Sequence, residues 1–66
     1  MATNAAKRDS FLRDAATRIA PLQDAVDLGV ATPAEQSALL SWKQYRVALN
    51  RLDLSASTID WPAEPV

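Results

Sequence analysis

The 66-residue chain contains neither cysteine nor histidine. Disulfide bonds are therefore impossible, and the common cysteine and histidine arrangements that hold zinc cannot form. A single glycine leaves no glycine-rich loop for phosphate binding. The remaining candidates for acid–base chemistry are scattered carboxylates, so we expect no active site, no metal and no cofactor.

A strong net charge and a long apolar run are also missing. Seven basic and eight acidic residues leave a net charge of −1, which provides no global field to attract nucleic acid or an anionic membrane. No run approaches the roughly 20 apolar residues that span a bilayer. The N-terminal residues have no apolar core of the kind found in secretory signals. The composition thus predicts a soluble protein with a cytoplasmic start.

The small size limits the core that the chain can build. A chain this short forms at most one domain and buries a smaller share of its surface than a typical domain does. Because disulfides and common zinc sites are excluded, its stability must come from helix packing and from partners.

A helical pattern extends from about Thr3 to Leu28. Apolar residues recur at alternating spacings of three and four, which predicts a helix over about residues 4–28. Pro21 lies inside this pattern, and a proline in a straight helix costs about 3 kcal/mol because it lacks a backbone donor. We therefore expect the first helix to be kinked or broken at Pro21.

Capping signals mark the end of this helix and the start of another. Gly29 follows the last apolar position, where a left-handed cap residue is favoured. Thr32 then supplies an N-cap, Pro33 a suitable first helical residue, and Glu35 the second half of a capping box. These signals predict a second helix over about residues 33–53.

A short connection over residues 29–32 forces the two helices to lie side by side and antiparallel. The facing pairs are then Leu22 with Leu39, Ile19 with Trp42, and Leu12 with Leu49. The prediction is an all-α fold, in which residues 1–54 form an antiparallel αα-hairpin. Two prolines in residues 55–66 predict an extended C-terminal tail.

The aromatic residues have alternative positions. Trp42 is expected either as the core aromatic of the hairpin, opposite Ile19, or as part of an interface. Tyr45 is less suited to complete burial because its hydroxyl needs a partner. Trp61 is costly to leave in water, so we expect it to dock on a helix or on a partner.

The second helix carries more apolar surface than one neighbouring helix can cover. Leu40, Val47 and Leu54 form a row spaced by seven that either the tail or another chain must cover. Tryptophan, tyrosine and arginine, which dominate interface hot spots, occur together in this helix. The candidate partner-binding residues are Leu40, Trp42, Tyr45, Arg46, Val47, Leu49, Asn50 and Trp61.

Three sequence blocks resemble the C-terminal region of caudovirus tail fibre assembly proteins. They are residues 18–29 (RIAPLQDAVDLG), residues 42–53 (WKQYRVALNRLD) and residues 60–62 (DWP), with a threonine-capped helix start between the first two. Together they span about two thirds of the chain.

The resemblance implies a partner and a place of action. Members of this family are phage and prophage proteins that help the distal, C-terminal end of a tail fibre protein to fold and trimerise in the host bacterial cytoplasm. Some are thought to stay at the fibre tip of the virion and to affect host recognition. Members usually carry a β-rich N-terminal domain that is implicated in gripping the fibre, and this chain is expected to correspond to the helical region alone.

Two other functions remain open from the residues. A homodimer could bury the row of Leu40 and Val47 in a four-helix bundle with a structural role. Lys43, Arg46 and Arg51 beside the aromatics could contact nucleic acid in a small DNA-binding regulator. We expect no nucleic-acid partner, because a phosphate-binding surface usually makes the whole domain basic.

Overall fold

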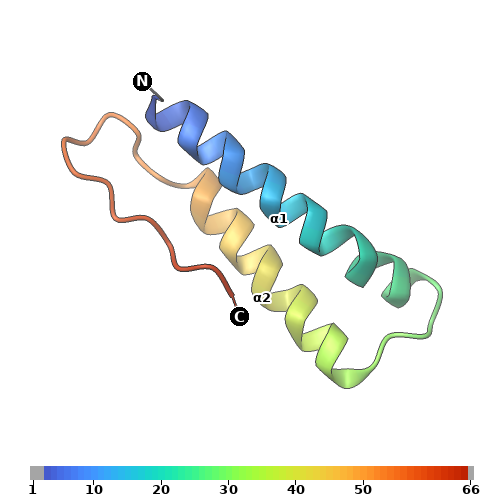
Figure 1. Cartoon of the computed structure of the whole chain (residues 1–66). Coiled ribbons are helices and arrows are strands. Elements are labelled where there is room, and N and C mark those ends of the chain that lie inside the picture. The colour runs from blue at the N-terminus through green and yellow to red at the C-terminus, as the bar shows by residue number, and fades with distance from the viewer. Residues whose placement is uncertain (1–2, 66) are drawn as a thin grey trace.

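The computed structural model describes residues 3–65. Helix α1 (Asn4–Asp27) and helix α2 (Pro33–Asn50) lie antiparallel, and the described residues contain no strand. The C-terminal segment returns along the hairpin, so its last described residues lie beside α2 (Figure 1). The fold is therefore the predicted all-α hairpin followed by an extended tail. Residues 1–2 and 66, which the predicted ranges included, lie outside the described residues.

Helix α1 continues through Pro21 without interruption. Of the alternatives expected at the proline, the structure therefore shows one helix, not two. The helix begins at Thr3, whose hydroxyl accepts a hydrogen bond from the Ala6 N–H at 3.0 Å. Pro21 cannot donate to the carbonyl of Thr17. One turn earlier, the Thr17 hydroxyl donates to the Arg13 carbonyl at 3.0 Å, an arrangement that often bends helices.

The turn after α1 is closed by a Schellman motif. Gly29 adopts a φ of 72°, and its N–H donates to the Val26 carbonyl at 3.0 Å. The Val30 N–H donates to the Ala25 carbonyl at 2.9 Å. The predicted cap at Gly29 is confirmed, because only this residue has a positive φ among those described.

Helix α2 begins at the predicted capping box and ends earlier than expected. The Thr32 hydroxyl accepts from the Glu35 N–H at 3.1 Å, and Glu35 Oε1 accepts from the Thr32 N–H at 2.9 Å. The helix stops at Asn50 rather than near residue 53. Asp53 accepts hydrogen bonds from the Ser55 hydroxyl at 2.6 Å and its N–H at 3.0 Å. Such side-chain bonds compete with helix continuation.

The core lies between the two helices. Its buried members are Ala15, Ile19, Leu39, Tyr45 and Leu49. Tyr45 is only 4% exposed, whereas Trp42 is half-buried and meets the Tyr45 ring edge-to-face at 5.7 Å. The expectation that Tyr45 is less suited to complete burial is therefore wrong, whereas Trp42 packs against the core as a partly buried side chain. Besides the two helices, the tail provides a third packing surface and brings Glu64 near Tyr45.

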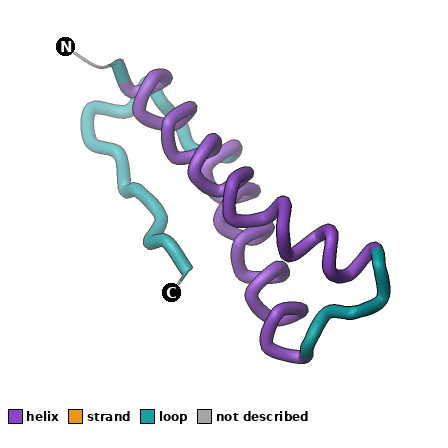
Figure 2. The backbone as a smooth tube through the Cα atoms, turned by 45° about the vertical axis from the view of Figure 1, so that its right-hand side comes forward, coloured by secondary structure: helices purple, strands orange, loops and turns teal. Residues whose placement is uncertain are grey.

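The C-terminal tail is held to the hairpin mainly by side chains. The Trp61 ring packs edge-to-face on Phe11 of α1 with centroids 5.4 Å apart, and Lys7 Nζ lies 4.9 Å from the Trp61 centroid. Asn4 Nδ2 donates to the Leu54 carbonyl at 3.4 Å. Trp61 thus docks on a helix of its own chain. Figure 2 shows the tail following the pair of helices back from their open end.

Candidate interaction surface

Helix α2 presents an apolar face to α1 and a second apolar strip to solvent. At about 100° per residue, Leu40 and Val47 lie on the side opposite the core residue Leu49. Leu40 is 60% exposed and Val47 is 44% exposed. The tail packs beside Phe11 and leaves them open. The expected row of three is shortened because α2 ends before Leu54, which is half-buried.

The eight predicted partner-binding residues fall into three groups. Tyr45 and Leu49 lie inside the core, 4% and 0% exposed, so in this fold they pack the hairpin and present no surface. Trp42, Arg46 and Trp61 are half-buried. Leu40, Val47 and Asn50 are exposed. The structure therefore places only part of the predicted set on a surface that a partner can reach.

Trp42 lies at the edge of a polar cleft of about 340 Å³. The cleft is formed by α1, α2 and the tail, and its other lining residues are Asp14, Thr17, Arg18 and Glu64. This location explains the half-burial of the indole ring: one side packs on Tyr45 and the other meets a charged cleft. Trp42 and this cleft lie on a different side of α2 from the exposed strip of Leu40 and Val47.

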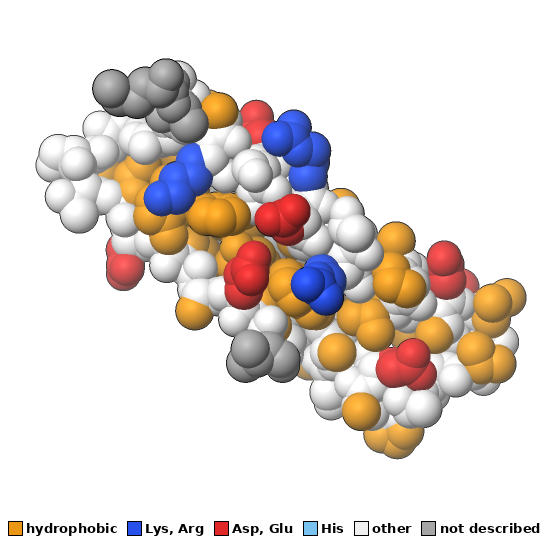
Figure 3. Space-filling view, in the orientation of Figure 1, with side chains coloured by type: hydrophobic (Ala, Val, Ile, Leu, Met, Phe, Trp, Pro, Cys, Tyr) orange, Lys and Arg blue, Asp and Glu red, His pale blue; other side chains and the backbone are white. Residues whose placement is uncertain are grey.

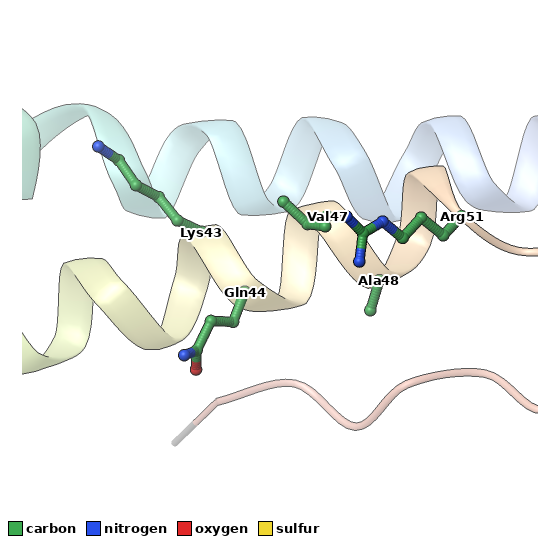
Figure 4. Close-up of a pocket in the computed structure, with 5 residues that line it drawn as sticks. All are labelled: Lys43, Gln44, Val47, Ala48 and Arg51. Atoms are coloured by element: carbon green, nitrogen blue, oxygen red, sulfur yellow. The ribbon is translucent and has the colours of Figure 1, made fainter.

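A shallow groove of about 610 Å³ runs along the outer side of α2. It is lined by Lys43, Gln44, Val47 and Ala48 of α2 and by Arg51, which caps the helix (Figure 4). Only Val47 belongs to the predicted partner-binding set, whereas Lys43 and Arg51 were candidates only for contact with nucleic acid. The signal that could have identified the others is the spacing of four that joins Lys43, Val47 and Arg51 on one helix face.

A second apolar region lies at the turn. Leu28 is 76% exposed and Val30 is 68% exposed, and Val26 at the end of α1 is 38% exposed. Figure 3 shows apolar side chains gathered at this end of the rod. Sequence reasoning did not identify this region, although Leu28 and Val30 flank the Gly29 cap and so have no facing residue in the hairpin.

Two groups have shifted acidity. Burial raises the pKa of the Tyr45 hydroxyl above its ordinary value, and the carboxylates of Glu64 and Asp14 add to the increase. The pKa of Asp53 is lowered, chiefly by the hydrogen bond from the Ser55 hydroxyl and then by that from the Ser55 N–H. Both shifts follow from packing and turn formation.

The cations of α2 form no ion pair among residues 3–65. Among residues 3–65 the one ion pair joins Arg8 and Asp9 at 3.2 Å on α1. The same residues contain no group of three or more acidic side chains that could hold a metal ion. Neither described helix is long and apolar enough to cross a membrane.

The fold and the exposed surface of α2 together define the class of protein. The chain is a small helical hairpin whose core is closed by its own tail and whose second helix presents apolar and basic side chains outward. The chain belongs to the family described as "Caudovirales tail fibre assembly protein, lambda gpK", whose family model matches residues 1–66. The resemblance found in the sequence is confirmed.

Curated relatives agree with this assignment. The chain is 55% identical over 60 residues to Protein TfaD of Escherichia coli K12 and to the tail fiber assembly protein of Escherichia phage lambda. It is 52% identical over 60 residues to a probable tail fiber assembly protein of Acyrthosiphon pisum secondary endosymbiont phage 1. Each match covers 89% of this chain but only 32%, 31% and 39% of the respective relative. The chain thus spans about a third of the length of these relatives, and no solved structure gives a significant match.

Proposed function

We propose that this chain acts in the assembly of phage tail fibres, by binding the distal, C-terminal end of a tail fibre protein and assisting its folding and trimerisation. Membership of the tail fibre assembly family supports this role. The structural observation that carries it is the exposed strip of Leu40 and Val47, which neither α1 nor the tail covers.

Such a protein would temporarily cover apolar surface of the fibre subunit. A subunit of a trimeric fibre exposes apolar surface until its two partners arrive, and such surface promotes aggregation. A rod of 43 × 17 × 17 Å has much outer surface relative to its core, which suits it to lie along another chain. Binding of this kind uses contact alone, which agrees with relatives named for assembly rather than for a reaction.

The proposed contact surface is the exposed part of the predicted set. Leu40 and Val47 supply apolar contact, Asn50 lies one helical turn after Val47, and Arg46 is half-buried on the neighbouring side of α2. Trp61 contributes by holding the tail on α1, since its ring packs on Phe11, whereas Trp42 packs on Tyr45 within α2. The proposed place of action is the cytoplasm of the host bacterium during phage assembly, with retention at the fibre tip as a further expectation.

The test is co-expression of the chain with the distal end of the tail fibre protein from the same genome. The wild-type chain is expected to co-purify with the fibre end and to increase its soluble yield. The double variant Leu40→Ser/Val47→Ser should fold and lose co-purification. The matched control is Leu28→Ser/Val30→Ser, which makes the same chemical change at the turn. No co-purification of the wild-type chain would overturn the proposal.

Self-association is a second candidate, supported by the same exposed strip. Two copies that bury Leu40 and Val47 would form a four-helix bundle. Sedimentation over a wide concentration range tests this idea: a dimer that Leu40→Ser/Val47→Ser abolishes would support it, and a monomer at high concentration would exclude it.

A further inference from the structure

The outer side of α2 is a local basic surface on a chain of net charge −1. After Glu35, α2 contains Lys43 and Arg46, and Arg51 caps it, with no acidic residue among positions 36–51. None of these three cations has a carboxylate within 4.0 Å among the residues that the structure describes. Lys43 and Arg51 are the two of these cations that lie on the outer side, and their positive charge is therefore not neutralised from within the hairpin.

The groove on α2 combines this charge with an apolar floor. Lys43 and Arg51 stand at its two ends, and Val47 and Ala48 lie between them (Figure 4). The Arg51 side chain extends back along the helix toward Val47, while Gln44 and Ala48 point to the side of the tail. A ligand lying along the groove would meet a cation, an apolar patch and a second cation in turn.

The charges argue against a second copy on this groove. A two-fold interface pairs the same surface with itself, so Lys43 and Arg51 of one copy would face the same residues of the other. Like charges opposite one another oppose association. The same distribution of charge favours a partner that carries carboxylates.

The floor of the groove argues against nucleic acid. Single-stranded nucleic acid is bound by positive grooves whose aromatic side chains stack on the bases, and no aromatic residue lines this groove. Val47 and Ala48 instead offer contact to a small apolar side chain. The overall negative charge of the chain also opposes approach to a polyanion.

We propose that the α2 groove binds an acidic peptide segment, in which carboxylates at either end pair with Lys43 and Arg51 and an apolar side chain between them packs on Val47 and Ala48. The segment is assigned to the distal end of the tail fibre protein, and to this extent the inference rests on the proposed function. The partner segment is thus acidic with a central apolar side chain, and Lys43 and Arg51 are the residues that recognise its carboxylates.

The test compares two variants with the same change in net charge. Lys43→Glu/Arg51→Glu reverses the charge of the groove, and the control Arg8→Glu/Arg13→Glu makes the same reversal on α1. Circular dichroism and thermal unfolding first establish that both variants are folded. Affinity for the purified fibre end is then measured by calorimetry at low and high salt.

The groove variant is expected to bind about tenfold more weakly than the wild type or worse, because attractive charge pairs become repulsive. The control should bind within about twofold of the wild type, since exposed charges away from an interface contribute little. Binding of the wild type should also weaken as salt rises. Acidic residues of the fibre end are then replaced by lysine one at a time. At least one of these fibre variants should bind the groove variant again.

Other outcomes separate the inference from the proposed function. If the groove variant and the control both bind the fibre end like the wild type, the acidic-segment inference is wrong and the proposed function stands. If the wild-type chain does not bind the fibre end, both are wrong. Binding of the wild type to duplex DNA, or to a second copy of the chain, is measured in the same way. If the groove variant loses that binding while it still binds the fibre end like the wild type, the inference is also wrong.

Discussion

The two faces of α2 carry similar apolar side chains, but one face is buried and the other is exposed to solvent. On the inner face Leu39 and Leu49 are sealed against α1, whereas on the outer face Leu40 and Val47 remain in water. The hairpin needs only one face for its core, so the outer residues contribute little to folding. The comparison teaches that burial, and not residue type, separates the part of this helix that stabilises the protein from the part available to a partner.

The largest expected effect comes from the inner face. Leu49 is fully buried, so Leu49→Ala should lower the free energy of unfolding by about 2–5 kcal/mol, through lost packing and the cavity left behind. Val47→Ala on the outer face should change it by about 0.5 kcal/mol or less. Denaturant unfolding of both variants measures the difference. Similar losses at the two positions would contradict the division of α2 into a structural face and an open face.

The tail provides the next test, because it is the element that gives the hairpin its third packing surface. Trp61→Ala removes the ring that packs on Phe11 and under Lys7 Nζ, and should cost about 1–2 kcal/mol in unfolding free energy. Lys7→Gln removes only the cation and should cost about 0.5–1 kcal/mol. NMR relaxation should show a mobile tail in Trp61→Ala beside an ordered α2. A tail that stays ordered would show that Trp61 is not its anchor.

Local features of the fold could be predicted because neighbouring residues determine them. Thr32 and Glu35 satisfy each other's backbone donors, and Gly29 supplies the positive φ that ends α1. The helix continued through Pro21 because tertiary packing on both sides of the proline outweighs its local cost. Hydrophobic spacing alone could not decide between the kinked and the broken helix.

The candidate site could be predicted only in part, because it depends on the rotation of α2 and on the path of the tail. A small rotation of a helix about its axis exchanges Trp42 and Tyr45 as the central aromatic, and the tail favours Tyr45. The groove residues Lys43 and Arg51 were identified as basic from the sequence. Their significance required knowing that the tail leaves this side of α2 open.

The buried position of Tyr45 has a consequence at alkaline pH. Its pKa in the folded state is raised above the ordinary value of 10.0 by burial and by Glu64 and Asp14. A raised pKa gives stability that is present below about pH 10 and lost as pH rises toward the folded-state value. Tyr45→Phe should therefore show a smaller alkaline decline than the wild type in unfolding measured from pH 8 to 11. Parallel declines would indicate that the hydroxyl is well solvated.

The smallest expected effect is at the start of the tail, in the turn formed by Asp53 and Ser55. Because hydrogen bonds hold the Asp53 pKa below its ordinary value of 3.8, the stability they give is present above that value and is lost as pH falls through the lowered pKa. Ser55→Ala removes the largest contribution, the 2.6 Å bond from the hydroxyl, but keeps the 3.0 Å bond from the backbone N–H. The Asp53 pKa, measured by NMR titration of the carboxyl carbon, should rise toward 3.8 without reaching it. A pKa unchanged by Ser55→Ala would mean that the backbone bond alone fixes this turn, and that the end of α2 is determined without the serine hydroxyl.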